Sequence, residues 1–172
     1  AIIRVGYRGS SSGALVQDPY FKKNISGATK AGIKVGLYFF TQAVNEAEAV
    51  EEASMAMSLA SGYKVTYPIF IDTESASSGR ANGLSKSART AVVKAFCQTV
   101  RNGGYKAGVY ASKSWYANQL NASALNGYCI WVAQYNSSCT YSGKYDMWQY
   151  SSKGSVSGIK GNVDMNISYT GY

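Results

Sequence analysis

Two acidic residues stand two positions apart at the end of an apolar segment. Residues 69–71 are Ile-Phe-Ile, and Asp72, Thr73 and Glu74 follow them in a chain with only nine acidic residues. Side chains alternate faces along a strand that rises about 3.3 Å per residue, so both carboxyl groups are predicted to share a face, with Cα atoms roughly 6 to 7 Å apart. Such a pair suits acid and base catalysis at one bond, or capture of a divalent cation.

The composition limits the chemistry of these carboxyl groups. The chain has no histidine, which excludes mechanisms that need imidazole and histidine-ligated zinc, so carboxylates must carry the proton transfers. Seventeen basic residues against nine acidic ones give a net charge of +8, which favours polyanions such as nucleic acid or the anionic polymers of a bacterial wall. Fifteen Tyr and three Trp supply rings that stack on sugars or bases. Charge alone does not choose between these ligands.

Strand-like and helix-like segments alternate along the chain, which predicts βα units and a parallel sheet in one domain over residues 1–172. Predicted strands cover 2–5, 35–40, 69–74, 107–111, 130–133, 146–150 and 162–167, and predicted helices cover 18–32, 45–62, 85–103 and 115–120. Asn45 with Glu48 three residues later indicates a capping arrangement. No run of 18 apolar residues occurs, so no membrane insertion is expected.

Other strands must place their own side chains around the acidic pair. In an α/β barrel, catalytic groups lie where strands end at their C-terminal rim. Pairs with the same two-residue spacing occur at Tyr38 with Phe40, Gly108 with Tyr110, Trp148 with Tyr150, and Asp164 with Asn166. The first two pairs predict aromatic groups around the acids. An ordinary strand surface is the alternative for the last two.

Three cysteines allow one intramolecular bridge. Cys129 and Cys139 would close a loop of about ten residues if they were bridged, and the sequence leaves this open. Cys97 lies in a helical pattern and is predicted to be a buried thiol.

Residues 1–5 are too short and carry charge too early for a signal peptide. We therefore expect a secreted protein whose export preceded this mature end, or one released by lysis.

Six segments, in the same order, resemble the glycoside hydrolase family 25 lysozymes, the N-acetylmuramidases of bacteria and phages. They are residues 18–38, 68–74, 108–110, 131–135, 148–150 and 161–166. Each motif is weak by itself, but six in order are specific, and they cover nearly the whole chain. The resemblance implies an α/β fold, an irregular TIM-like (β/α)5β3 barrel. It also implies cleavage of the β-1,4 bond between N-acetylmuramic acid and N-acetylglucosamine in bacterial peptidoglycan, without a cofactor or metal.

The resemblance also implies roles for individual residues. Glu74 would be the proton donor, and Asp72 would stabilise the developing positive charge or orient the acetamido group of the substrate. Asp164 would complete the acidic cluster. The residues expected to hold sugar rings are Tyr38, Tyr110, Trp131, Trp148 and Gln149, with Phe40 added by its position on the face of Tyr38. Strict alternation cannot place Trp148 and Gln149 on one face, so at least one of these two assignments rests on the resemblance alone.

One departure from the family is that its members begin with a strand of the form G-I-D-V-S, whose aspartate joins the site, and this chain has no counterpart. We therefore expect an N-terminally incomplete barrel whose exposed strand edges need a strand-completing partner or a second copy. Two other functions stay open. One is a wall-binding module that kept the aromatic residues without turnover. The other is a metal-dependent D-x-E exonuclease, although the acidic strand of such nucleases usually comes first in the fold, and no nucleic-acid partner is expected.

Overall fold

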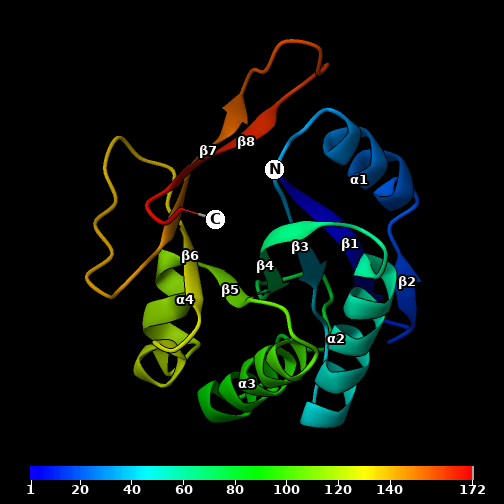
Figure 1. The fold of residues 1–172 in the computed structure, drawn as a ribbon. Helices are drawn as coiled ribbons and strands as arrows, with labels where there is room; N and C mark the ends of the chain where they lie inside the picture. The colour runs from blue at the N-terminus through cyan, green and yellow to red at the C-terminus, as the bar shows by residue number, and fades with distance from the viewer. Residues whose placement is uncertain (172) are drawn as a thin grey trace.

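Eight strands join into a single curled sheet in the computed structural model of the protein, which describes residues 1–171 (Figure 1). The strands are β1 (Ile2–Arg8), β2 (Leu15–Gln17), β3 (Val35–Phe40), β4 (Val65–Asp72), β5 (Ala107–Ser112), β6 (Cys129–Ala133), β7 (Met147–Gly154) and β8 (Val163–Ser168). Their order is β2-β1-β3-β4-β5-β6-β7-β8, and only β2 and β8 run antiparallel to their neighbours. In the part of the chain that is described, β2 and β8 each have one neighbour, so the sheet is a half-barrel.

Helices connect most of the parallel strands and lie on the outer side of the sheet (Figure 1). They are α1 (Phe21–Lys30), α2 (Glu46–Ala60), α3 (Lys86–Asn102) and α4 (Lys113–Asn118), with a short 3-10 helix at Ala122–Leu125. After β6 the chain continues through a loop into the β7–β8 hairpin. This order confirms the α/β fold class and the β-rich C-terminal part that the sequence predicts.

The helix starts follow the capping signals in the sequence. The Asn45 side chain accepts a hydrogen bond from the Glu48 backbone N–H at 2.9 Å, and the Glu48 carboxylate accepts one from the Val44 N–H at 2.9 Å. At α3, the Ser85 hydroxyl accepts from the Ala88 N–H at 3.2 Å. Caps of this kind stabilise a helix by about 1 kcal/mol each, and they fix where α2 and α3 begin against the sheet.

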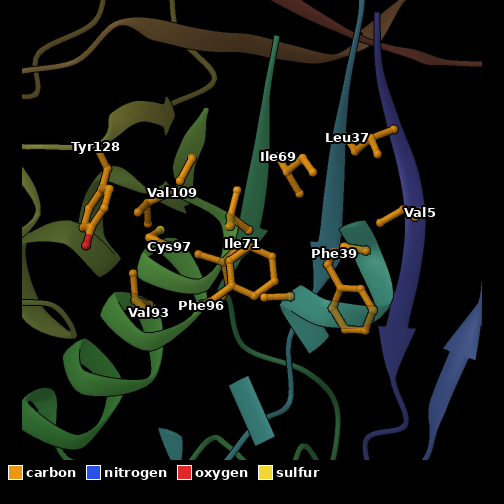
Figure 2. Close-up of a cluster of buried hydrophobic side chains, with 14 of the residues drawn as sticks. Val5, Leu37, Phe39, Ile69, Ile71, Val93, Phe96, Cys97, Val109 and Tyr128 are labelled. Carbon is orange, nitrogen blue, oxygen red and sulfur yellow. The ribbon is translucent and has the colours of Figure 1, made fainter. Parts of the chain in front are cut away.

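The main hydrophobic core lies between the outer face of the sheet and the helices (Figure 2). Leu37 and Phe39 of β3 and Ile69 and Ile71 of β4 are fully buried there, with Phe96 of α3 among their neighbours. Full burial of one such side chain contributes about 1.5 to 3 kcal/mol. Because residues alternate along a strand, this outward packing turns residues 70 and 72 toward the inner face.

A second cluster of buried residues fills the inner face. Its central contacts are between rings: the centroids of Phe70 and Trp131 lie 5.1 Å apart, and those of Tyr110 and Trp131 lie 4.6 Å apart. Ala133 and Met147 complete the cluster. The inner face is therefore a packed aromatic layer.

The absence of a side chain at Gly108 leaves space for the Phe70 ring in this aromatic layer. A Cβ atom at position 108 would lie 2.4 Å from two ring carbons of Phe70, which is fully buried against Trp131, and 3.0 Å from the Cys129 carbonyl oxygen. Gly108→Ala is therefore expected to lower the free energy of unfolding by about 1 to 3 kcal/mol. Gly27→Ala is the matched control, because Gly27 lies within α1 and a Cβ atom there would have nothing within 4 Å. That change should raise stability by up to about 1 kcal/mol. Equal urea midpoints for both variants would contradict the prediction.

The predicted strand over 2–5 is wrong in length, because β1 continues to Arg8 and pairs with β2. A Cβ atom at Gly6 would lie 2.6 Å from the Val16 carbonyl oxygen, so glycine permits the close approach of β2. This three-residue β2 was not predicted, since its sequence is too short for a periodic signal. Similarly, β7 extends to Gly154, beyond the predicted end at 150.

The Cys129–Cys139 bridge that the sequence left open is not formed in the structure. Cys97 is fully buried, as predicted.

Among the helices of residues 1–171, none combines the length and apolar character needed to cross a bilayer.

Candidate active site

A cleft of about 720 Å³ lies on the inner face of the sheet and extends to the β7–β8 hairpin. It is lined by Ala1, Ile2, Asn24, Tyr38, Asp72, Glu74, Tyr110, Trp131, Tyr135, Gln149, Ile159, Asn162, Val163, Asp164 and Asn166. These residues come from β1, α1, β3 to β8 and the loops between them. One cavity thus collects side chains from both ends of the chain.

Three of the nine acidic residues line this cleft: Asp72, Glu74 and Asp164. Asp72 is the last residue of β4, whereas Glu74 lies beyond the strand, so the prediction that both belong to one strand is wrong. The chain stays paired for one more residue, because the Thr73 N–H donates to the Tyr110 carbonyl at 3.1 Å. Asp164 enters from β8. The structure therefore places all three predicted acids in a single cavity.

The environments of these acids differ. Asp72 is buried, with 5% of its surface exposed, and its Oδ1 has no hydrogen-bond partner in the structure. Burial raises the pKa of Asp72 well above its ordinary value, and the nearby Glu74 carboxylate raises it further, while Arg4 acts in the opposite direction. The pKa of Glu74 is also raised, first by burial and then by Asp164. The Asp72–Glu74 pair therefore retains a proton to higher pH than an isolated carboxyl group would.

Tyrosine and tryptophan side chains form the other walls of the cleft. The Tyr110 and Tyr135 hydroxyls both donate to Gln149 Oε1, at 2.7 and 2.9 Å, and the Trp131 Nε1–H donates to Asn166 Oδ1 at 2.9 Å. These bonds hold the rings in fixed orientations, so the wall is rigid before any ligand binds.

Burial also keeps the tyrosines neutral. It raises the pKa of Tyr38 to about 12, even though Arg4 lowers it, and burial followed by the Asp72 charge raises the pKa of Tyr110 still more. A neutral hydroxyl can donate a hydrogen bond to a ligand, which suits Tyr38 to bind polar groups beside its apolar ring face. The Tyr110 hydroxyl already donates to Gln149, so it can only accept a hydrogen bond from a ligand.

Two predicted sugar-binding residues do not reach the cleft. Trp148 lies in the main hydrophobic core on the outer face, where its Nε1–H donates to the Gln134 carbonyl at 2.8 Å and its ring lies 5.7 Å from that of Tyr150. Alternation along β7 sends Gln149 inward and Trp148 outward, so the prediction for Trp148 is wrong. Phe40 pairs in register with Asp72 but does not line the cleft.

Sequence reasoning missed Tyr135, which is 59% exposed and donates to Gln149 from the loop after β6. Its signal was present, since position 135 continues the alternation of Trp131 and Ala133. Asn24 and Ile159 also line the cleft. They come from α1 and the β7–β8 turn, and no local pattern predicts which part of the sheet such segments approach.

No group of three or more His, Cys, Asp or Glu side chains within residues 1–171 is arranged to hold a metal ion. What the structure shows is a curled parallel sheet with an acidic, aromatic-walled cleft on its inner face, which is the plan of α/β-barrel enzymes. The chain belongs to the glycosyl hydrolases family 25, whose model matches residues 3–159.

Similar proteins agree with this assignment. The autolytic lysozyme of Clostridium acetobutylicum is 28% identical over 165 residues, which cover 95% of this chain and 48% of that protein. The modular autolysin LytC of Streptococcus pneumoniae has a TM-score of 0.81 at 28% identity, covering 96% of this chain and 39% of that one. A family 25 glycosyl hydrolase from Bacillus anthracis has a TM-score of 0.80 at 25% identity, and the match covers 99% of this chain and 77% of that one. The chain spans about half the length of the curated relatives it matches.

Proposed function

We propose that the protein is a peptidoglycan hydrolase that cleaves the β-1,4 bond between N-acetylmuramic acid and N-acetylglucosamine. The observation that carries the proposal is the convergence of Asp72, Glu74 and Asp164 in one aromatic-walled cleft. Family membership supports it, as do relatives named as lysozyme and autolysin. The LytC autolysin has also been solved with a synthetic peptidoglycan ligand.

Glu74 is the proposed proton donor to the glycosidic oxygen. A general acid must still hold its proton near the working pH, and both burial and the Asp164 charge raise the pKa of Glu74 in that direction. Glu74 is also the more exposed member of the Asp72–Glu74 pair, so a bound sugar can reach it.

Asp72 is proposed to determine where the pair carries its proton. In the free protein, the stronger burial of Asp72 favours the proton on Asp72. An acetamido N–H of the substrate that donates to the Asp72 carboxyl group, which lines the cleft, would favour the ionised form, and the proton would then reside on Glu74. Substrate binding would thereby prepare the acid, and the Asp72 carboxylate would stabilise the positive charge that develops on the sugar.

Tyr38, Tyr110, Trp131 and Gln149 are proposed to hold the sugar rings, by stacking and by hydrogen bonds with their polar groups. The net charge of +8 supports attraction to an anionic wall. We place the activity at the bacterial wall, after export or after release by a phage.

Clearing of a purified peptidoglycan suspension tests the proposal. Lysis that persists in EDTA, followed by muropeptides with N-acetylmuramic acid at the new reducing end, is the expected result. Binding to the suspension without clearing would instead indicate a wall-binding module. EDTA-sensitive release of nucleotides from DNA would indicate the exonuclease.

Asp164→Asn tests the electrostatics of the cleft. Because the Asp164 charge raises the pKa of Glu74, its removal should lower that pKa and move the alkaline limb of the kcat/KM profile to lower pH. The rate at the optimum should fall by about tenfold, or roughly 1.4 kcal/mol of barrier. Asp146→Asn, which removes the same charge outside the cleft, should leave the limb in place. An unshifted limb in Asp164→Asn would show that Asp164 does not act on the acid.

A further inference from the structure

Residues 75–84 connect Glu74 to α3 and fold back on themselves. The Asn82 side chain accepts from the Ala76 N–H at 3.2 Å and donates to the Ala76 carbonyl at 2.7 Å, while the Gly79 N–H donates to the same carbonyl at 3.0 Å. Ser78, at the apex, has a positive φ of 55°. The loop is thus a compact unit, and its contacts with the body decide where it sits.

The strongest of these contacts is made by Arg80. Its two terminal nitrogens donate to both carboxylate oxygens of Glu48, at 2.7 and 2.9 Å, and its backbone N–H donates to the Ser10 carbonyl at 3.0 Å. A bidentate arginine–carboxylate pair fixes orientation as well as distance. Glu48 is itself held, because it lies in the first turn of α2, where its carboxylate accepts from the Val44 N–H and its backbone N–H donates to the Asn45 cap. The loop is therefore docked on a rigid helix start.

Buried polar groups next to Glu48 hold the start of α2 in place. Arg8 is 4% exposed and donates to Glu52 Oε1 at 2.9 Å, to the Glu48 carbonyl at 2.9 Å and to the Gly13 carbonyl at 2.7 Å. Glu52 is fully buried, and burial raises its pKa to about 7. A buried ion pair is a poor source of net stability, but it does restrict geometry.

Gln42 joins the loop to the same support. It is fully buried, its Oε1 accepts from the Ala81 N–H at 3.3 Å, and its Nε2 has no partner in the structure. Next to it, the Thr41 N–H donates to the Asp72 carbonyl at 3.0 Å, at the end of the acidic strand. The end of β4 and the loop that follows it are thus both tied to the segment after β3.

We propose that Arg80, through Glu48, is a positioning residue that holds Glu74 in register with Asp72 and Asp164. The inference rests on the proposed function, since it assigns the role of the contact in that reaction. Glu74 lies between two tethers, the Thr73 N–H bond to Tyr110 and the contacts of Arg80. Loss of the Arg80–Glu48 pair loosens the second tether and lets Glu74 move toward solvent. A displacement near 1 Å can reduce a rate by about 100-fold.

Arg80→Ala is the direct test, with soluble peptidoglycan oligosaccharides as substrate. We expect kcat to fall by about ten- to a hundredfold with little change in KM. The alkaline limb of the pH profile should move to lower pH, because a displaced Glu74 is less buried and farther from Asp164. Arg80→Lys should be intermediate, since an ammonium group cannot form the bidentate pair. Lys144→Ala is the control of equal charge, taken from the surface pair with Asp146 at 3.8 Å.

Glu48→Gln guards against loss of folding in Arg80→Ala, because glutamine still caps α2 while it removes the charge. Hydrogen exchange of residues 75–84 without substrate separates this inference from the proposed function. Faster exchange in Arg80→Ala and Glu48→Gln, but not in Lys144→Ala, supports the anchor even if the wild type proves inactive. An active wild type with unchanged kcat, pH limb and exchange in both variants would overturn it.

Discussion

Replacing Glu74 with glutamine is expected to lower kcat for peptidoglycan cleavage by at least about 1000-fold, measured as new reducing ends. Glutamine keeps the size of the side chain but cannot give a proton to the glycosidic oxygen. KM should change little, because the aromatic walls of the cleft are untouched.

The stability of the same variant checks that the loss is chemical. The pKa of Glu74 is raised in the folded protein, so its ionised form opposes folding, and stability is lost as pH rises from the ordinary glutamate pKa through the raised one. Glutamine has no ionised form, so Glu74→Gln should unfold at neutral pH no lower in temperature than the wild type. Glu46→Gln, an exposed change of equal charge on α2, should keep full activity. Retention of a tenth or more of the wild-type rate in Glu74→Gln would remove Glu74 as the acid.

Periodic burial explains why much of the fold was predictable from the sequence. Leu37, Phe39, Ile69 and Ile71 occupy every second position and pack into the outer core, and that pattern specifies both the strands and the side that the helices cover. The β2 strand has three residues and no periodicity, so it forms only because Gly6 admits it beside β1. A close approach between two separate segments of this kind cannot be predicted from the residues of either segment alone.

In the candidate site, too, the residues that follow a local pattern were predictable and those that depend on contacts between distant segments were not. Alternation showed that Trp148 and Gln149 cannot share a face, but not which of them lies inward, and the resemblance assigned both to the site. In the structure Gln149 lines the cleft and the Trp148 ring lies in the outer core. Tyr135 was predictable by extending the parity of β6 into the loop. The contacts of Arg80 were not, because they join residues 32 positions apart in sequence through a loop without a repeating pattern.

Replacement of Asp72 is expected to have the second large effect on kcat. Asp72→Asn is expected to lower kcat by about 100-fold or more, a loss near 2.7 kcal/mol of transition-state stabilisation. Asparagine resembles the protonated Asp72 of the free protein in shape and charge, so the empty cleft should be unchanged. It cannot become an anion when the substrate N–H approaches, however, so it can neither send the proton to Glu74 nor stabilise positive charge on the sugar.

A stability comparison distinguishes this role from a structural one. The pKa of Asp72 is raised well above the ordinary aspartate value, mainly by burial, so wild-type stability should fall as pH rises above that ordinary value toward the raised one. Asp72→Asn should lose less stability over that rise. Asp18 is equally buried at 5% exposure but bonds Arg4 at 2.5 Å, so Asp18→Asn should destabilise the protein instead. If Asp72→Asn kept the wild-type kcat and pH profile, Asp72 would be a buried neutral acid without a catalytic role, and proton placement by the substrate would be wrong.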